Sequence, residues 1–273
     1  MRRDAMAGTR AQQTFDLRRK KAFVCDLDGT LFMGSHPIEP AIRFVKEHAD
    51  DYAFFYLTNN TSKTPQAYLD KLSGAGVRVC EEQILTPLTT LETYIREQGY
   101  TSVFDVANTI VHRHLCERLP GVRFDYEPGV NQLVALAYDT ELTYEKLRRA
   151  AALLNANPAL DYVTTHGDAC CPSEEGPIPD VGGLIALMRT TNGREPSRVF
   201  GKPAPSLLAP VLQSFTTEQI AVVGDRLYTD KAMADNAGID FVCVLSGETT
   251  RENLAGYRGT EPAVILETLG DLA

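Results

Sequence analysis

Short apolar runs alternate with amphipathic segments along most of the 273-residue chain. Runs rich in Val, Ile, Leu, Phe and Tyr predict strands at residues 23–26, 54–58, 103–106, 133–138, 162–165, 220–224 and 241–245. Between them, apolar residues at helical spacing predict helices at residues 40–48, 65–72, 87–98, 144–155, 206–215 and 230–237. Strands that alternate with helices are typical of βαβ units, so we expect an α/β fold built on a parallel sheet.

Several of the predicted helices carry start and stop signals. Thr86 and Thr143 precede two of them as candidate N-caps, and Gly99 and Gly238 follow two of them. By contrast, residues 167–183 are rich in Gly and Pro and show no regular period. A loop of this length inside a compact protein is usually functional or disordered, and we interpret this one as a binding loop.

Polar side chains follow several of the apolar runs. They are Asp26 and Asp28, then Thr58, Asn59 and Asn60, then Lys202, and finally Asp225 and Asp230. Taken singly, each group has an ordinary role in a turn or a helix cap. In an open parallel sheet, however, ligands bind outside the carboxyl ends of the strands, so together these residues indicate one site.

The residue types at these strand ends suit the handling of a phosphoryl group. Asp26 and Asp225 can supply the oxygen ligands that Mg²⁺ prefers, and a carboxylate can also attack phosphorus. A second carboxyl group two residues on, Asp28, can exchange protons with the leaving group and with water. Thr58 and Lys202 can stabilise the charge that develops on the phosphoryl oxygens.

The motifs resemble those of a known superfamily. Asp26-x-Asp28-Gly29-Thr30, Thr58-Asn59-Asn60, Gly201-Lys202-Pro203 and Gly224-Asp225-x-x-x-x-Asp230 match the four motifs of the haloacid dehalogenase (HAD) superfamily in order and spacing. Within and beyond these motifs, Gly201-Lys202-Pro203, Gly224-Asp225-Arg226-Leu227 and Leu245-Ser246-Gly247 look in particular like stretches of the NagD-like phosphatases. That group (subfamily IIA, C2-capped) includes 4-nitrophenyl phosphatases and nucleotide monophosphatases. The resemblance implies a Rossmann-like parallel-sheet core with an inserted α/β cap of the C2 type.

The resemblance also implies roles for the acidic residues. Asp26 would be the nucleophile and a Mg²⁺ ligand, and Asp28 would be the general acid/base with its backbone carbonyl on the metal. Asp225 would be the third protein ligand, and Asp230 would support the metal's outer shell, where it would orient the ligands. The implied activity is Mg²⁺-dependent hydrolysis of small phosphomonoesters through an aspartyl phosphate.

The remaining motif residues would bind the substrate. The resemblance implies that Thr58, Asn59 and Asn60 hold the phosphoryl oxygens. Lys202 would neutralise charge between Asp26 and the phosphate, as a catalytic and a substrate-binding residue.

The spacing of the motifs locates the cap. Roughly 25 residues separate Asp28 from the second predicted strand, whereas about 140 separate Asn60 from Gly201. We therefore expect residues 22–81 and 181–273 to form the catalytic core and residues 82–180 to form the inserted cap. His166 and Asp168 stand where related chains carry Asn-Pro-Asp, which makes them tentative specificity residues.

Composition and charge limit the kinds of partner. The chain is 44% hydrophobic and 23% charged, with a formal net charge of -9, so we expect neither nucleic acid nor a membrane as a partner. Six scattered cysteines without a Cys-x-x-Cys pair predict reduced thiols and a cytoplasmic location. Residues 1–21 are basic without an apolar centre, so we interpret them as a flexible tail, although a targeting segment stays open.

Other functions stay open at this point. A phosphotransferase or phosphomutase of the same superfamily would use the same motifs, as would a catalytically silent HAD-like protein that regulates by binding. The substrate is left open among sugar phosphates, nucleoside monophosphates, phosphoglycolate and pyridoxal phosphate. Related proteins often dimerise through such caps, so a homodimer is also an expectation.

Overall fold

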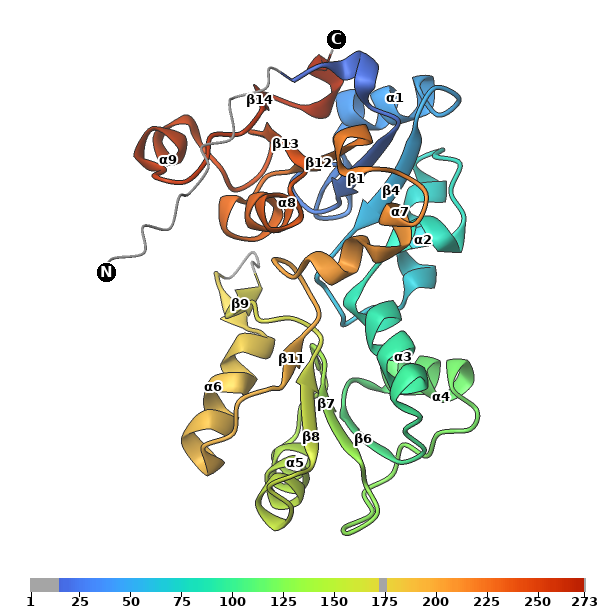
Figure 1. The fold of residues 1–273 in the computed structure, drawn as a ribbon, viewed down its shortest axis with the longest axis vertical. Helices are drawn as coiled ribbons and strands as arrows, with labels where there is room; N and C mark the ends of the chain where they lie inside the picture. Colours follow the sequence, from blue (N-terminus) through green and yellow to red (C-terminus); the bar gives the residue numbers. More distant parts are fainter. Residues whose placement is uncertain (1–14, 172–175, 273) are drawn as a thin grey trace, which may run out of the picture.

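The computed structural model describes residues 15–171 and 176–272, which form two parallel sheets covered by helices (Figure 1). One sheet belongs to the core, at the top of the view, and the other to the cap, below it. The chain leaves the core after β5 and returns to it after β11. The predicted α/β fold with a parallel core sheet and a separate cap sheet is confirmed.

The core sheet places the first strand at its centre. The strand order is β14 (Val264–Leu266), β13 (Asp240–Val244), β12 (Ile220–Gly224), β1 (Ala22–Asp26), β4 (Ala53–Leu57) and β5 (Ile84–Leu85). β1 pairs in parallel with β12 on one side and with β4 on the other. All residues of β1 are buried, as expected for a parallel strand covered on both faces.

Helices cover both faces of the core sheet because successive side chains of a strand point to opposite faces. Phe23 packs in the hydrophobic cluster that contains residues of α1 and α2, whereas Val24 packs with residues of α7 and α8. The core helices are α1 (Glu39–Glu47), α2 (Pro65–Gly74), α7 (Ala209–Leu212), α8 (Ala232–Ala237) and α9 (Arg251–Gly256).

The cap repeats this layered plan on a smaller scale. Its sheet has the order β11 (Arg198–Val199), β8 (Asp161–Thr164), β7 (Leu133–Leu136) and β6 (Val103–Val106). α3 (Pro87–Gln98) and α4 (Thr109–Arg118) contribute to the hydrophobic cluster on one face, and α5 (Tyr144–Ala156) and α6 (Val181–Asn192) to the cluster on the other. The hairpin of β9 (Cys170–Cys171) and β10 (Ile178–Pro179) lies at the end of the cap that meets the core (Figure 1).

The predicted strands are all present, and so are four of the helices, α1, α2, α3 and α5. Thr86 and Thr143 cap α3 and α5 as expected. Residues 206–215 differ, because a 3₁₀ turn (Pro205–Leu208) precedes the short α7. Residues 230–237 also differ, because a π-helical turn (Leu227–Lys231) precedes α8.

Two helices of the cap escaped the sequence analysis. α4 buries Val111 and Leu115 but has a mostly polar sequence, so its apolar pattern is weak. α6 begins inside residues 167–183, and its first residues, Val181-Gly182-Gly183, resemble the loop before them. Its local signals are Asp180 as the N-cap and Gly193, which has a left-handed φ of 67°, as the C-cap.

The structure argues for different domain boundaries from those predicted. α6 packs in the cap, and β11 pairs with β8 of the cap sheet, so we propose that the second boundary lies near residue 200 instead of 180. The predicted tail is wrong for residues 15–21: Leu17–Arg19 form a 3₁₀ turn, and Lys20 is buried. Residues 1–14 of that tail lie outside the described residues.

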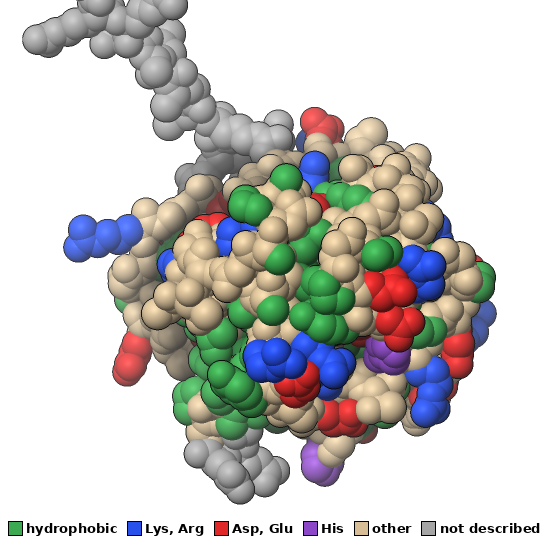
Figure 2. Space-filling view, turned by 90° about the horizontal axis from the view of Figure 1, so that it is seen from below, with side chains coloured by type: hydrophobic (Ala, Val, Ile, Leu, Met, Phe, Trp, Pro, Cys, Tyr) green, Lys and Arg blue, Asp and Glu red, His purple; other side chains and the backbone are tan. Residues whose placement is uncertain are grey.

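The surface at the cap end mixes hydrophobic side chains with side chains of both charges (Figure 2). Within residues 15–171 and 176–272, no disulfide joins the cysteines. A search of the same residues for a helix long and apolar enough to cross a membrane found none.

Candidate active site

The carboxyl edge of the core sheet brings the predicted site residues together. Asp26 is the last residue of β1 and pairs in register with Leu57 of β4, so Thr58 begins the adjacent loop. Asp225 follows β12 on the other side of β1, where Cys25 pairs with Val223. Topology alone therefore places these three side chains side by side.

A cavity of about 520 Å³ opens at this edge, between core and cap. Its lining includes Asp26, Asp28, Thr58, Asn59, Asn60, Asp168, Lys202 and Asp225. Asp230 and His166 are fully buried and are absent from the described lining. The structure thus gathers nearly all of the predicted residues around one cavity.

Three buried carboxylates cluster at the bottom of the cavity around one lysine. Asp26, Asp225 and Asp230 each offer an oxygen within 4.8 Å of the others. The Nζ of Lys202 donates to Asp26 Oδ1 and, at 2.7 Å, to Asp230 Oδ1. Three carboxylates and one ammonium leave two negative charges in a site that is almost closed to solvent.

Burial and mutual repulsion shift the pKa values in this cluster. Burial raises the pKa of Asp26, and the adjacent Lys202 cation opposes that rise. Burial and the charge of Asp230 raise the pKa of Asp225 to about 6. The pKa of Lys202 lies above its ordinary value because the attraction of Asp230 and Asp26 outweighs burial, so Lys202 stays a cation.

The cluster fits a divalent cation in charge and in donor type. Asp225 Oδ2 accepts from the backbone N of Glu248 at 2.6 Å, whereas Oδ1 is buried and has no hydrogen-bond partner among the described residues. Both oxygens of Asp230 are occupied, one by Lys202 and one by the backbone N of Arg226 at 3.0 Å. Asp26 and Asp225 therefore have the freer oxygens, and hard oxygen donors suit Mg²⁺.

Glycines allow the backbone to approach Asp225 closely. Gly29 has a φ of 91°, which favours glycine, and a Cβ there would overlap the Asp225 carboxyl group. A Cβ at Gly247 would overlap the same group. Two turns far apart in the sequence thus close around one carboxylate.

Asp28 lies at the mouth of the cavity and is set apart from the buried cluster. Its carboxylate accepts from Lys71 Nζ at 3.1 Å, and that ammonium sits 4.3 Å from the centre of the Phe32 ring. The Asp28 side chain is about half exposed (47%), so it can reach the substrate and solvent. Two carboxylates separated by one residue therefore have distinct environments.

Asn59 links Lys202 to the cap. Its Oδ1 accepts from the backbone N of Lys202 at 2.7 Å, and its Nδ2 donates to the backbone O of Lys202 at 3.2 Å. The same Nδ2 donates to Asp168 Oδ2 at 3.0 Å. Thr61 adds a second link, because its hydroxyl lies 2.9 Å from that of Thr165, beyond β8.

His166 does not face the cavity, contrary to one possibility raised by the sequence. It is fully buried, and neither ring nitrogen has a hydrogen bond within the described part of the chain. Nδ1 lies 3.6 Å from Asp168 and Nε2 lies 3.4 Å from Asp180. Burial lowers the pKa of His166 to about 4, so the ring is neutral at pH 7.

The sequence analysis assigned no individual role to several residues of the described cavity lining, although Cys170, Cys171 and Asp180 lie in the predicted binding loop. The residues without an individual role are Met33, Gly34, Lys63, Tyr68, Lys71, Cys170, Cys171, Asp180, Arg226 and Glu248. Helical spacing could have indicated two of them, because Tyr68 and Lys71 lie three positions apart on α2 and share a face. For Asp180 the available signal was its position before an apolar run as an N-cap.

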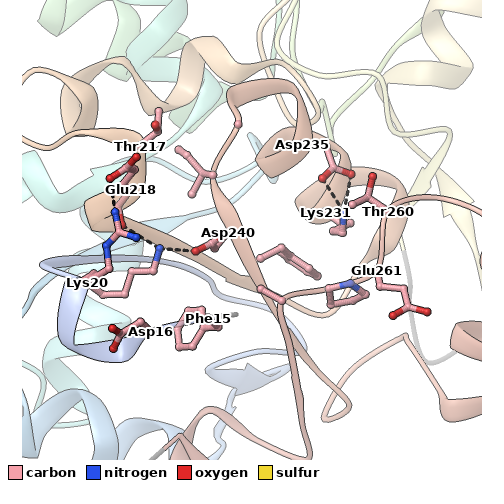
Figure 3. Close-up of a pocket in the computed structure, with 16 residues that line it drawn as sticks. Phe15, Asp16, Lys20, Thr217, Glu218, Lys231, Asp235, Asp240, Thr260 and Glu261 are labelled. Atoms are coloured by element: carbon pink, nitrogen blue, oxygen red, sulfur yellow. Dashed lines mark hydrogen bonds and ion pairs between the residues drawn. The ribbon is translucent and has the colours of Figure 1, made fainter. Parts of the chain in front are cut away.

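A second cavity, of about 440 Å³, lies at the amino ends of the core strands (Figure 3). Its two buried lysines are satisfied within the protein: Lys20 donates to Asp240 at 2.6 Å, and Lys231 donates to both oxygens of Asp235 at 2.6 Å. This cavity therefore offers a substrate little free charge, which makes the cavity at the opposite end of the sheet the stronger candidate for the site.

The buried Asp180 predicts a pH-dependent stability. Burial raises its pKa to about 7, well above the unfolded value, so its contribution favours folding at low pH and is lost as the pH rises through 7. Asp180→Asn keeps an N-cap acceptor for the backbone N of Val181 and removes the titration. We therefore expect the free energy of unfolding of the variant, relative to that of the natural chain, to increase from pH 5 to pH 8, as measured by urea unfolding. An unchanged difference between the two proteins over that range would contradict the shift.

A parallel core sheet with an inserted cap, and carboxylates and a lysine at the cleft between them, defines a phosphoryl-transfer enzyme of the HAD type. Residues 23–118 match the family described as haloacid dehalogenase-like hydrolase, and residues 199–272 match a HAD-hydrolase-like family. The structure resembles 4-nitrophenylphosphatase from Thermotoga maritima with a TM-score of 0.85 and 33% identity, covering 93% of this chain and 96% of that one. A p-nitrophenyl phosphatase from Archaeoglobus fulgidus matches with a TM-score of 0.85 and 28% identity, covering 93% and 98%.

Curated relatives agree with the structural ones. 5′-nucleotidase YutF of Bacillus subtilis is 29% identical over 242 residues, covering 87% of this chain and 92% of the relative. Acid sugar phosphatase of Staphylococcus aureus is 29% identical, covering 87% and 91%. The chain belongs to the HAD-like hydrolases, in the NagD-like p-nitrophenylphosphatase family.

Proposed function

We propose that this phosphatase of small phosphomonoesters works through an aspartyl phosphate formed on Asp26, with Mg²⁺ as its cofactor. The observation that carries the proposal is the buried cluster in which Lys202 bridges Asp26 and Asp230 beside Asp225. The adjacent Lys202 cation favours the charged form of the Asp26 carboxylate against the effect of burial, and a carboxylate in this position can attack phosphorus. The relatives named above hydrolyse phosphate esters, which supports this reaction class.

In the first step, an oxygen of Asp26 attacks phosphorus and the bond from phosphorus to the leaving oxygen breaks. Asp28 donates its proton to that oxygen, so the product leaves as an alcohol. Asp28 must first separate from Lys71 and take up a proton from solvent, and its half-exposed position permits both. Thr58, the backbone of Asn59 and Lys202 hold the phosphoryl oxygens while charge develops on them.

In the second step, water attacks the phosphorus of the aspartyl phosphate. Asp28, now a carboxylate, takes a proton from that water, and the bond between Asp26 and phosphorus breaks to release phosphate. Asp26 and Asp225, with the backbone carbonyl of Asp28, would hold the metal, and Asp230 would fix Lys202 behind them. A bound Mg²⁺ would neutralise charge on the phosphoryl oxygens and on the acidic cluster.

The metal requirement gives a direct test. We expect phosphate release from 4-nitrophenyl phosphate, glucose 6-phosphate or AMP to require Mg²⁺, to stop in EDTA and to return when Mg²⁺ is added in excess. Without the cation, two uncompensated negative charges in the cluster repel the phosphate dianion. Full activity in EDTA would contradict the proposal, and conversion of a substrate to an isomer without phosphate release would favour a phosphomutase instead.

The cap supplies the surface that faces the leaving group. Asp168, Cys170, Cys171 and Asp180 reach the cavity from the cap, and we propose that they contribute to substrate choice. The homodimer stays a prediction, as does the cytoplasmic location.

A further inference from the structure

The cap and the core present different electrostatic surfaces to the leaving group. On the core side, Lys71 is paired with Asp28, and Arg226 Nε lies 3.0 Å from Glu248. Each of these cations thus has its own carboxylate. Lys63 is the remaining cation of the described lining apart from Lys202.

On the cap side, the two charged groups of the described lining are both acidic. Asp168 and Asp180 line the cavity, and among the described residues neither forms an ion pair with a lysine or an arginine. Asp168 accepts from the Asn59 amide, and Asp180 accepts from the backbone N of Val181 at 2.7 Å. His166 lies between the two acids, 3.6 Å from Asp168 and 3.4 Å from Asp180.

The neutral state of His166 matters for this surface. The ring is fully buried and stays neutral because burial, together with the nearby Lys202, outweighs the attraction of Asp168 for its charged form. It separates the two acids without neutralising either of them. Among the described residues of the cap, no lysine or arginine pairs with these two acids, so their charge acts on the cavity, where Arg226 of the core is the cation that affects Asp180.

We propose that Asp168 and Asp180 form an acidic wall that selects the leaving group by charge. The wall accepts a leaving group that carries hydroxyl or ammonium groups and disfavours one that carries a carboxylate or a second phosphate. Hydroxyl and ammonium groups can donate hydrogen bonds to the carboxylates, whereas a second anion is repelled. This inference rests on the proposed function and narrows its substrate class.

Two matched pairs of phosphate esters test the wall. Sorbitol 6-phosphate and 6-phosphogluconate share an open chain and differ by a terminal carboxylate. Glucose 6-phosphate and glucosamine 6-phosphate share a ring and differ by an ammonium group. Binding is measured by calorimetry with Mg²⁺ on Asp26→Asn protein, which is not expected to consume the esters, at pH 8, where Asp180 is ionised because its pKa is about 7.

We expect 6-phosphogluconate to bind about tenfold more weakly than sorbitol 6-phosphate, and glucosamine 6-phosphate to bind a few-fold more tightly than glucose 6-phosphate. Adding Asp180→Asn should reduce the first ratio to about threefold or less. Adding Asp50→Asn should leave it unchanged, because this exposed residue pairs with Arg78 on the outer surface. Equal affinities within both pairs, a ratio that Asp180→Asn does not change, or no binding of any ester would overturn the inference.

The failure of the proposed function would look different. Phosphate release from 4-nitrophenyl phosphate by the natural chain is measured separately. Phosphate release without the charge preference would contradict the acidic wall but would agree with the proposed phosphatase activity. If no phosphate is released but the charge preference in binding is present, the proposed phosphatase activity is contradicted, and the site is a charge-selective site that binds phosphate esters.

Discussion

Asp26→Asn is expected to abolish phosphate release, with a loss of at least about 10⁴-fold in kcat. The amide has nearly the shape of the carboxylate but cannot form the acyl phosphate. Asp26 ends β1 at the centre of the core sheet and is buried, so the backbone around it should stay in place. Removing one of three clustered carboxylates also relieves repulsion, so the melting temperature should not fall.

Asp225→Asn is the matched control for this variant. It removes a charge from the same cluster and weakens the metal site but leaves the nucleophile intact. We expect its activity to recover in part as Mg²⁺ is raised, whereas that of Asp26→Asn does not. Mass spectrometry of acid-quenched protein should find a phosphoryl group on Asp26 in the natural chain. Mg²⁺-dependent turnover by Asp26→Asn would sink the covalent mechanism.

Lys202→Met is expected to reduce kcat by about 10²–10³-fold and to destabilise the folded protein by about 3–5 kcal/mol at neutral pH. Met fills a similar volume but leaves Asp26 and Asp230 buried without their shared cation. Uptake of a proton by one of the carboxylates would limit the loss of stability. That proton would also make Asp26 a poor nucleophile, so both effects have one cause.

Lys231→Met provides the control for removing a buried lysine. Lys231 is as buried as Lys202 but pairs with Asp235 beside the second cavity. We expect this variant to lose stability and to keep its activity, as measured by urea unfolding and by 4-nitrophenyl phosphate hydrolysis. Equal activity of the Lys202→Met and natural proteins at saturating Mg²⁺ would show that Lys202 has a structural role only.

Topology explains why so much of the site could be predicted from the sequence. Asp26, Thr58 and Asp225 each follow a strongly apolar run, and parallel neighbours in a sheet end at a common edge. The positions of the apolar runs were therefore enough to predict that these three residues lie close together at one edge of the sheet. The same local patterns set the strands and the helices capped by Thr86 and Thr143.

Side-chain directions could not be predicted in this way. Asp26 and Asp28 are separated by one residue, yet one joins a buried cluster and the other pairs with Lys71 on α2. Their environments depend on which distant residues pack against the turn. The cap boundary that we propose differs from the predicted one for a related reason. A strand as short as β11 has little sequence pattern of its own, and its place in the cap sheet is evident from its pairing with β8.

The sequence by itself determined the parallel core, the inserted cap and the four motifs at the edge of the sheet, because these follow from the periodicity of the apolar residues and from the spacing within and between the motifs. The tertiary structure alone decided which charged groups pair with one another and which side chains face the cavity. It set Lys202 between Asp26 and Asp230, turned His166 away from the cavity and brought Asp180 into it. Electrostatic interactions in a buried site act between groups that are close in space, and Asn59 and Asp168, which form one such contact, are 109 positions apart in the chain.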